Sequence, residues 1–486
     1  MPSRSVPLTL KPSITSCISH SAKTFSFLNL PHTFEKAIDW NFSSYGRLWT
    51  YNLTYFDYLQ QEKVSKAEGM ALVYDFIEQA GQIKEGLEPF AISLRGINWV
   101  KFLTRHGIKE QTIDDSLYAQ YHILSDNLEY HLLGNHLLEN GFSLLFGAYY
   151  FQDERLYAQA KAILTAELDE QVLGDGAHFE LSPMYHQIML HRVLDCVNLV
   201  QNNDFMGQEL LPLLREKAEA MLGWLVAISY EDGTIPLFND SANGIAPTTR
   251  QLEMYGRALL ARHPEGGSES ANEKGFDRAP AMTVSGASGY LKVKTGRYEC
   301  VVDVGKIGSD YIPGHAHADT FNFELRIEGQ PFIVDTGLSS YESGARRELE
   351  RGTAAHNTVE VAGKNSSEVW DSFRVADRAK IVAFNVTDNA ITATHDGYRK
   401  MGIYHTRQWT FENSKIVIID RLNKEANAVA RVHFHPDVTE EMINKHINIR
   451  PLSITEYQYA PEFNYRLTAK MAEIPFEKAL IVEIRL

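Results

Sequence analysis

The stretch from 312 to 358 decides the fold of the second half of this chain. It begins with IPGHAHAD at 312–319, continues through FIVDTG at 332–337 and closes with RGTAAHNT at 351–358. Three histidines and two aspartates therefore fall within a few dozen residues. These residue types are common metal ligands and common proton-transfer groups. The stretch thus predicts a metal site or an active site carried by strands.

Two strands are predicted between the histidine pair and the closing segment. Apolar residues alternate with polar ones over 321–327, a period of two that buries one face of a strand. EGQ at 328–330 is typical of a turn, and the apolar residues at 332–334 indicate a more fully buried strand. The pattern predicts an antiparallel pair whose ends carry polar side chains.

His317, Asp335 and His356 are the candidate metal ligands. They are expected at strand ends or just beyond them, where a rigid sheet can hold ligands in place. Two imidazoles and one carboxylate suit zinc, with water or substrate in a fourth position. The alternative is that all three are hydrogen-bonded core residues, because histidine is often buried without a metal and the spacing is no self-sufficient motif.

Length and composition indicate a soluble globular protein with two domains, or three small ones. The chain has 486 residues, of which 44% are hydrophobic and 11% aromatic, so a large core is available. Its formal net charge of −15 argues against nucleic-acid binding and against anionic membrane surfaces. This charge gives no support to an acidic sugar ligand, which would need a cleft lined by Arg, Lys and His.

The N-terminal residues 1–12, MPSRSVPLTLKP, contain no apolar segment of the kind found in signal peptides. We therefore expect a cytoplasmic protein as written, or a periplasmic one if the true N-terminus lies upstream. No apolar run of membrane-spanning length is visible. Cys17, Cys196 and Cys300 are widely spaced and odd in number, which suits burial or a reduced compartment better than a disulfide framework.

Helical patterning is followed by strand-like patterning. Apolar residues recur at three- and four-residue spacing over 66–262. Helices are predicted near 66–80, 88–105, 115–132, 136–151, 154–172, 184–201, 208–229 and 248–262. The fold class expected is an α+β multidomain protein. Its parts are a helical domain at 1–262 with an aromatic-rich N-terminal segment, a linker at 263–288 and an antiparallel β-sandwich at 289–486.

An aromatic run, LWTYNLTYFDYL, lies at 48–59 and includes Trp49 and Tyr51. Packing of the N-terminal segment against the first helices is the simpler explanation. The alternative is a stacking wall for sugar rings, whose C–H faces pack against aromatic planes. On that alternative Trp49 and Tyr51 would bind substrate.

The segment GNHLLENG at 134–141 is predicted to begin a helix. There His136 and Glu139 would share a face at i and i+3, with Asn135 at the helix start. An amide, an imidazole and an acid at a helix N-terminus could face an anion. An N-cap followed by a surface pair explains the same residues, because Asn is a common cap.

A second helix start is predicted in FELSPMYHQ at 179–187. Ser182 and Pro183 suit the N-cap and the first helical position, which places Tyr185 in the first turn. The helix dipole there would favour a phenolate and could lower the pKa of this tyrosine. Such a residue could move a proton, although a tyrosine packed against the next helix is the plainer interpretation.

The loop EDGTIPLFND at 231–240 offers Asn239 as a candidate ligand, although Asn and Asp are common turn residues. Arginines can grip a carboxylate or sulfate with two hydrogen bonds. The best candidates are Arg346, Arg347, Arg351 and Arg374. A solvated charged face explains at least half of them.

Taken in order, these motifs resemble the heparinase II/III-like polysaccharide lyases. The resemblance rests on WxYNLxYFDY, NHxxENG, ExSPxYH, DGxxPxFND and the histidine-rich stretch, and it covers most of the chain. It implies an N-terminal incomplete (α/α) toroid followed by a C-terminal antiparallel β-sandwich. It also implies cleavage of uronic-acid-containing polysaccharides by β-elimination.

The resemblance further implies roles for single residues. Asn135 and His136 would neutralise the uronate carboxylate, with Glu139 nearby. Tyr185 would remove the proton on C5 and protonate the departing O4. His315 would help to neutralise charge or act as the base for the other epimer. These four residues, Asn135, His136, Tyr185 and His315, are the predicted catalytic set.

The remaining expectations concern ligands. His317, Asp335 and His356 match the zinc ligands of some family members, in which the metal supports the loops near the cleft. The predicted substrate-binding residues are Glu139, Arg351, Trp49, Tyr51, Asn239 and Arg374. The expected partner is an acidic polysaccharide, with no nucleic acid and no membrane, bound by a monomer or a homodimer.

Three functions remain open on the sequence. The first is a lyase that leaves a 4,5-unsaturated uronate. The second is a catalytically silent, zinc-stabilised carbohydrate-binding protein in polysaccharide synthesis or export. The third, ranked last, is a glycoside hydrolase that uses carboxylates such as Glu139 and Glu180. The sequence leaves glycosaminoglycan, alginate and bacterial exopolysaccharide substrates open.

Overall fold

The computed structural model describes residues 4–15, 19–261, 281–284, 286–448 and 453–486. The chain divides into two compact units, and both are discontinuous in sequence. The helical unit comprises Met1–Val172, Gln187–Leu222 and Gly244–Arg262, and the strand-rich unit comprises Leu173–His186, Gly223–Asn243 and His263–Leu486. Most of the expected linker, 263–280 and residue 285, lies outside the described residues, and the expected domain boundaries stay predictions.

All eight predicted helices are present, although the helix predicted at 115–132 begins and ends earlier than that range. They are α2 (Lys66–Gln79), α3 (Pro89–His106), α4 (Gln111–Asp126), α5 (Gly134–Phe151), α6 (Glu154–Gln171), α7 (Pro183–Asn202), α8 (Leu211–Ile228) and α9 (Thr249–Leu260). Local chemistry sets several ends. The Asp153 carboxylate accepts hydrogen bonds from the first backbone amides of α6, and Thr248 and Gln251 form a capping box on α9.

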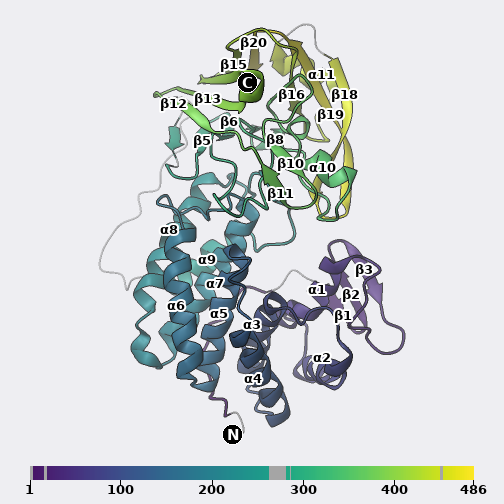
Figure 1. Cartoon of the computed structure of the whole chain (residues 1–486), viewed down its shortest axis with the longest axis vertical. Helices are drawn as coiled ribbons and strands as arrows, with labels where there is room; N and C mark the ends of the chain where they lie inside the picture. Colours follow the sequence, from purple (N-terminus) through teal and green to yellow (C-terminus); the bar gives the residue numbers. More distant parts are fainter. Residues whose placement is uncertain (1–3, 16–18, 262–280, 285, 449–452) are drawn as a thin grey trace. The chain divides into compact units, whose positions relative to one another are not determined.

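Helix α5 forms the centre of the helical unit and is buried along almost its whole length. It packs against α3, α4 and α6, and Figure 1 shows α3, α4 and α5 side by side. Gly147 permits this close approach, because a Cβ atom there would lie 2.7 Å from the ring of Tyr121 on α4. A helix apolar on all sides must be a core helix, which explains its burial.

The aromatic-rich N-terminal segment forms elements that the sequence did not predict. Three short antiparallel strands, β1 (Ser19–Ser21), β2 (Thr24–Phe27) and β3 (Leu30–Thr33), pair in sequence order. Helix α1 (Arg47–Tyr55) carries most of the aromatic run. Figure 1 shows the three strands, α1 and α2 in purple. The strands are too short to produce a clear period of two.

The strand-rich unit holds three larger antiparallel sheets and one hairpin. The first sheet has the order β4 (Ala281–Val284), β5 (Tyr290–Lys294), β6 (Tyr298–Asp303), β7 (Phe323–Ile327) and β8 (Gln330–Ile333). The second has the order β12 (Ile381–Val386), β13 (Ala390–Tyr398), β14 (Ile403–Phe411), β15 (Lys415–Leu422), β20 (Ala479–Arg485) and β17 (Ile447–Asn448). The third has the order β18 (Ser453–Glu462), β19 (Tyr465–Phe476), β16 (Ala428–His433) and β9 (Val359–Val361).

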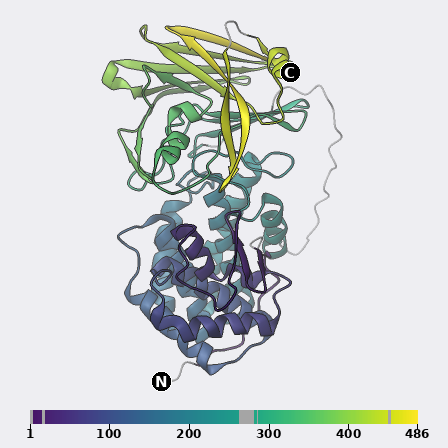
Figure 2. The same ribbon diagram turned by 90° about the vertical axis from the view of Figure 1, so that its right-hand side faces the viewer.

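The hairpin pairs β10 (Glu368–Trp370) with β11 (Arg374–Ala376), and two short helices, α10 (Ala345–Arg351) and α11 (Glu440–His446), complete the unit. Residues from all three sheets share one core, which includes Leu325, Val361 and Trp409. Strands β13 to β15 alternate buried and more exposed positions. Figure 2 shows the long strands of this unit in green and yellow. The predicted order, a helical part followed by a part built of antiparallel sheets, is therefore confirmed.

The strand pair predicted in the histidine-rich stretch is confirmed with shifted ends, because β8 begins at Gln330, within the predicted turn, and ends at Ile333. Strand β7 begins at Phe323, two residues later than the alternation indicated. Phe321 has a φ of 72° and lies in a turn in which the amide of Asn322 donates to the carbonyl of Asp319. That turn ends the histidine segment just before the sheet. No helix of the described residues is long and apolar enough to cross a membrane.

Candidate active site

The candidate site in the strand-rich unit begins at the first turn of α7. The Ser182 hydroxyl oxygen accepts a hydrogen bond from the Tyr185 amide at 3.2 Å, which confirms Ser182 as the cap. The same hydroxyl donates to the carbonyl of Asp240 at 2.7 Å. The helix start and the loop at 239–241 are therefore held together, and Tyr185 and Asp240 are positioned by one serine.

Tyr185 contacts two aromatic residues. Its ring stacks on the imidazole of His315, with centroids 3.9 Å apart and planes at 30°, and its oxygen accepts from the Tyr341 hydroxyl at 3.2 Å. Part of its surface stays exposed. Burial of the rest raises the pKa of Tyr185, and the Tyr341 hydroxyl and Arg347 oppose this only in part. The expected lowering by the helix dipole is therefore outweighed.

Asp240 is the centre of the polar network and is completely buried. Arg347 donates to both carboxylate oxygens, at 2.5 and 2.7 Å. His315 Nδ1 lies 2.9 Å from Oδ2, and His317 Nε2 lies 2.8 Å from Oδ1. Burial alone would raise the pKa of Asp240, but Arg347 and the two histidines hold it well below its ordinary value.

An ionised carboxylate can only accept hydrogen bonds, so both histidines must donate to Asp240. His315 therefore carries its proton on Nδ1 when neutral, and His317 carries its proton on Nε2. Nε2 of His315 is left with a lone pair, 3.9 Å from Oε2 of Glu180. Nδ1 of His317 is left with a lone pair inside the protein. One carboxylate thus sets the tautomer of two functional candidates.

Arg347 comes from α10 and joins this network to the β10–β11 hairpin. Its Nε donates to the carbonyl of Ser372 at 3.0 Å. Its guanidinium lies 5.1 Å from the ring centroid of Tyr341 and 5.5 Å from that of Phe373. Phe373 also meets His315 edge to face at 5.8 Å. The network therefore has an aromatic rim.

Sequence reasoning did not single out Asp240 or Tyr341, and it named Arg347 only among four arginines. Asp240 is the last residue of the DGxxPxFND motif. The sequence therefore pointed to its position but did not predict that it would be a buried ion-pair partner. A turn aspartate and a buried ion-pair partner have the same sequence signature. Only the fold shows that 240, 341 and 347 meet.

His317 and His356 both show the arrangement of metal-binding histidines. Nδ1 of His356 lies 2.7 Å from Oδ2 of Asp335. Burial opposes ionisation of Asp335, but His356 holds the pKa of Asp335 below its ordinary value, so this histidine donates from Nδ1. Each imidazole therefore directs one N–H at a carboxylate. Metal-ligating histidines are oriented in this way. Burial opposes the charged form of His356, but Asp335 raises the pKa of His356 above its ordinary value, so a metal at its Nε2 would have to displace a proton.

The other two ring nitrogens, Nδ1 of His317 and Nε2 of His356, are buried without a hydrogen-bond partner. Their rings lie 5.3 Å apart between centroids. Burial lowers the pKa of His317 to about 4, so it is neutral near pH 7. Both carboxylate oxygens of buried Asp319 also lack a partner. Orphaned groups of these types fit a bound cation in their chemistry.

Asp335, the third predicted ligand, is engaged by protein donors. Its Oδ1 accepts from the Gly337 amide at 2.8 Å, and its Oδ2 accepts from Asn322 at 2.5 Å as well as from His356. Over the described ranges, no group of three His, Cys, Asp or Glu side chains has the arrangement of a metal site. Zinc therefore stays a proposal.

The predicted residues of the helical unit lie at the start of α5. Leu133, with a φ of 55°, precedes the first helical residue, and Asn135 is buried within the first turn. The Glu139 side chain is completely buried and pairs with Nε of Arg192 on α7 at 3.2 Å. Burial raises the pKa of Glu139. The alternative of an N-cap and a surface pair is therefore wrong for Asn135 and Glu139.

His136 keeps 40% of its side-chain surface exposed. Its Nδ1 lies 3.2 Å from Oε1 of Glu129, and its ring lies 4.5 Å from that of Phe90. Glu129 in turn accepts from the buried amide of Asn140 at 2.9 Å. His136 is thus exposed and oriented, as a substrate-contacting residue must be.

The two aromatic residues predicted to bind substrate in the run at 48–59 make mainly packing contacts within the protein. Trp49 is fully buried, and its Nε1 donates to the carbonyl of Leu30 at 2.9 Å. Tyr51 is partly exposed, and its hydroxyl donates to Glu88 at 3.0 Å while its ring stacks on Tyr55. Core packing explains Trp49, whereas substrate binding by Tyr51 stays a prediction.

Two other predicted substrate-binding residues have structural contacts. Asn239 is buried, with its amide donating to the carbonyl of Leu181 at 2.9 Å and its Oδ1 accepting from the His317 amide at 3.0 Å. Arg351 is buried, and its NH1 and NH2 groups donate to backbone carbonyls. These contacts favour a structural role for both. Arg374 is exposed on β11.

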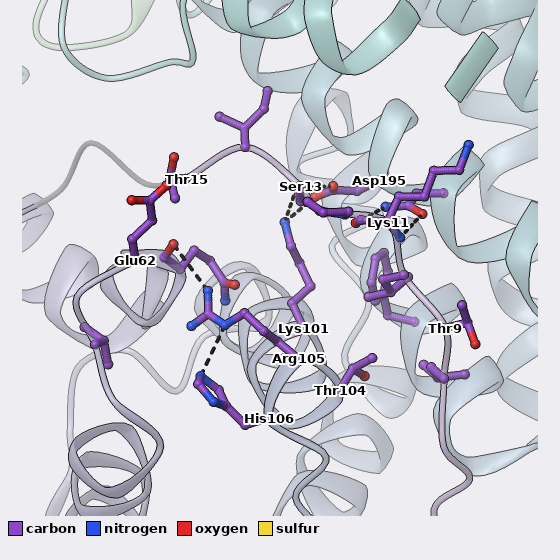
Figure 3. A pocket seen from close by; sticks show the side chains of 18 residues that line it. Thr9, Lys11, Ser13, Thr15, Glu62, Lys101, Thr104, Arg105, His106 and Asp195 are labelled. Atoms are coloured by element: carbon purple, nitrogen blue, oxygen red, sulfur yellow. Dashed lines mark hydrogen bonds and ion pairs between the residues drawn. The ribbon is translucent and has the colours of Figure 1, made fainter. Parts of the chain in front are cut away.

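A separate cavity of about 710 Å³ lies within the helical unit. Residues 8–15 line it together with the C-terminal part of α3 and two residues within α7, and Figure 3 shows Lys101 and Asp195 pointing toward each other beside Ser13. Lys101 Nζ lies 2.7 Å from Oδ2 of Asp195. Arg105 donates to the carbonyls of Leu59 and Gln60. The cationic groups of the cavity are therefore already engaged.

Two family models match the chain. Residues 277–470 match "Heparinase II/III-like, C-terminal", and residues 115–259 match "Heparinase II/III N-terminus". The second match includes the start of α5 and the start of α7. The first includes the histidine-rich stretch, α10 and the β10–β11 hairpin.

Curated relatives and a solved structure agree with these matches. A heparin-sulfate lyase of Bacteroides stercoris is 25% identical over 333 residues, which cover 63% of this chain and 46% of the relative. One of Pedobacter heparinus is 27% identical over 331 residues, which cover 65% of this chain and 48% of the relative. The chain thus spans about half the length of the curated relatives it matches.

The crystal structure of heparinase III aligns with a TM-score of 0.69 at 16% identity, over 93% of this chain and 80% of that one. At that identity the likeness shows the fold alone. It confirms the predicted class, an incomplete (α/α) toroid followed by an antiparallel β-sandwich.

Proposed function

Because the chain belongs to the heparinase II/III-like family, we propose that it is a polysaccharide lyase. It cleaves a uronic-acid-containing polysaccharide by β-elimination. A base takes the proton on C5 of the uronate, the C4–O4 bond breaks, a double bond forms between C4 and C5, and an acid protonates the departing O4. The product carries a 4,5-unsaturated uronate end.

The observation that carries the proposal is the stacking of Tyr185 on His315 while Asp240 holds His315. The raised pKa of Tyr185 keeps its proton in place near neutral pH, which suits an acid that protonates O4. The hydrogen bond to Asp240 leaves a lone pair on Nε2 of His315, which suits a base. The resemblance allowed Tyr185 to perform both steps, whereas the geometry supports a division between two residues.

Neutralisation of the uronate carboxylate is proposed for Asn135 and His136, as the resemblance implies. Preorganised amide and imidazole donors make the C5 proton more acidic by stabilising the charge that develops after its removal. His136 is exposed and is oriented by Glu129. Glu139 is buried against Arg192, so we assign it to holding α5 and α7 together and not to direct substrate contact.

For the metal, we propose that His317 and His356 hold a structural zinc ion through Nδ1 and Nε2, with Asp335 beside them. When bound, the ion would supply a positive charge and a cross-link between the segments at 317, 335 and 356. The two buried ring nitrogens without a hydrogen-bond partner support this assignment. No step of the elimination requires the ion.

The substrate class is proposed from the relatives. Two of them are named heparin-sulfate lyases, which makes a sulfated uronate polysaccharide the first substrate to test. The test is a panel of heparan sulfate, chondroitin sulfate, alginate and acidic exopolysaccharides, followed by the ultraviolet absorbance of unsaturated uronate. A rise on one member supports the proposal. A panel with no rise, together with retained binding, would favour the carbohydrate-binding alternative.

A further inference from the structure

We propose that the β10–β11 hairpin is a sugar-binding subsite of the same site. Trp370 and Phe373 stack on sugar rings, and Arg374 binds an oxyanion of the sugar, either carboxylate or sulfate. This inference rests on the proposed function and extends it to the residues that hold the substrate.

The hairpin displays three recognition side chains. Trp370 and Phe373 keep 46% and 43% of their surface exposed, and Arg374 is exposed as well. Trp370 and Arg374 are cross-strand partners, so their side chains leave the same face of the strand pair. An aromatic plane beside a guanidinium matches an acidic sugar, which has an apolar C–H face and a negative substituent.

Two buried arginines fix the hairpin tip. Arg351 donates to the carbonyls of Trp370 and Asp371 at 3.3 and 3.0 Å, and Arg347 donates to the carbonyl of Ser372 at 3.0 Å. Burying two guanidiniums beneath a surface turn is expensive for stability alone. It gives the exposed side chains a fixed position, which binding sites need.

Arg351 also contributes charge. Its NH1 and NH2 groups donate to backbone carbonyls, and burial lowers its pKa to about 10, so it remains a cation near pH 7. A buried cation partnered only by carbonyls leaves positive potential at the tip. The Asp371 carboxylate, which accepts from Ser343 at 2.5 Å and from the Ser372 amide at 2.8 Å, offsets one positive charge, but the guanidiniums of both Arg351 and Arg374 act on it. The local field can therefore attract an anion despite the net charge of −15.

The hairpin is continuous with the candidate active site. The ring of Phe373 lies 5.8 Å from that of His315 and 5.2 Å from that of Tyr341. It also packs on Gly314, where an added Cβ would lie 3.6 Å from Cβ of Phe373. A sugar ring on Phe373 would therefore adjoin the sugar at His315, and the Trp370–Arg374 pair would contact a further ring.

The test measures binding without turnover. In a Tyr185→Phe background, calorimetry gives the dissociation constants of size-defined oligosaccharides of heparan sulfate, of desulfated heparan sulfate and of alginate. Trp370→Ala and Phe373→Ala should each weaken binding about threefold to tenfold. Arg374→Ala should weaken it about tenfold or more. If Arg374→Ala loses affinity only for the sulfated sugar, the oxyanion bound by Arg374 is sulfate. If it loses affinity for all three sugars, the oxyanion is the carboxylate.

Matched controls lie on another strand surface of the same unit. Phe384 is 50% exposed on β12, and Arg421 is exposed on β15, so Phe384→Ala and Arg421→Ala should bind as the background does. Equal affinity of the hairpin variants and these controls would overturn the proposal, as would absence of binding to all three sugars. Because the readout needs no elimination, a chain that binds but never cleaves would refute the lyase activity and leave the hairpin assignment standing.

Discussion

Asp240 accepts a hydrogen bond from His315, whose Nδ1 lies 2.9 Å from the carboxylate oxygen Oδ2. The other oxygen of the same carboxylate accepts from His317. The proposed base and a proposed metal ligand are therefore oriented by one buried side chain. Arg347 keeps that side chain ionised. We expect the proton-transfer geometry and the metal site to respond together when Asp240 is changed.

Asp240→Asn tests this coupling. The amide keeps the shape but removes the charge that holds both imidazoles, and it leaves Arg347 buried without its counter-ion. We expect kcat/KM to fall about a hundredfold or more and the free energy of unfolding to fall by about 3–5 kcal/mol. Glu360→Gln, at a part-buried ion pair with Arg431, is the control and should change activity little. Unchanged kinetics in Asp240→Asn would contradict the assigned role.

Metal removal should loosen the strand-rich unit without removing the proton-transfer groups. His317→Ala should lower bound zinc, measured by elemental analysis, and should lower the melting temperature. A chelator should lower the melting temperature of the unaltered protein and should have no further effect on the variant. His405 is buried against Asp420 and is not one of the proposed ligands, so His405→Ala should lose stability but keep its zinc. Equal zinc content in His317→Ala and the unaltered protein would refute the assignment.

The buried pair of Lys101 and Asp195 should stabilise the helical unit. Lys101→Ala leaves the carboxylate buried without its cation and should cost about 3–5 kcal/mol in urea unfolding. Lys161→Ala breaks an exposed pair with Glu209 and should cost less than about 1 kcal/mol. Equal losses from the two substitutions would show that burial does not decide the strength of these pairs.

The same pair predicts a pH dependence. Burial would raise the pKa of Asp195, but Lys101, His191 and Arg192 hold it below its ordinary value. A lowered folded-state pKa stabilises the fold above the unfolded value of about 4 and ceases to do so as the pH falls. The stability difference between the unaltered protein and Lys101→Ala should therefore be greatest near neutral pH and should shrink in acid. A difference that grows in acid would reverse the assigned sign.

Trp49→Ala separates core packing from sugar stacking. The indole is fully buried and lies 4.9 Å from the ring of Phe27 between centroids. We expect a loss of about 3–5 kcal/mol in the free energy of unfolding, typical of a large aromatic core residue. Substrate affinity of the folded fraction should stay the same. Weakened substrate affinity with an unchanged free energy of unfolding would instead support the hypothesis that Trp49 stacks on a sugar ring.

The sequence predicted the features that local patterns encode. The eight helices from α2 to α9 and the strand pair β7–β8 follow from periodicity and capping chemistry. Strands β1 to β3 were not predicted because each is only three or four residues long. Asp240 and Tyr341 were not predicted as site residues because their roles arise from contacts between residues far apart in the sequence. The pKa of Tyr185 was expected to fall because the helix dipole is local, whereas the burial that raises it depends on the tertiary fold.

The most direct test of the central claim is the ultraviolet absorbance of unsaturated uronate in a matched pair of proteins. The unaltered chain should raise the absorbance on at least one uronate polysaccharide. Tyr185→Phe, which keeps the ring stacked on His315 and removes only the hydroxyl, should lower kcat about a hundredfold or more while oligosaccharide binding is retained. Undiminished elimination by Tyr185→Phe, or no unsaturated product from the unaltered chain on any member of the panel, would contradict the account.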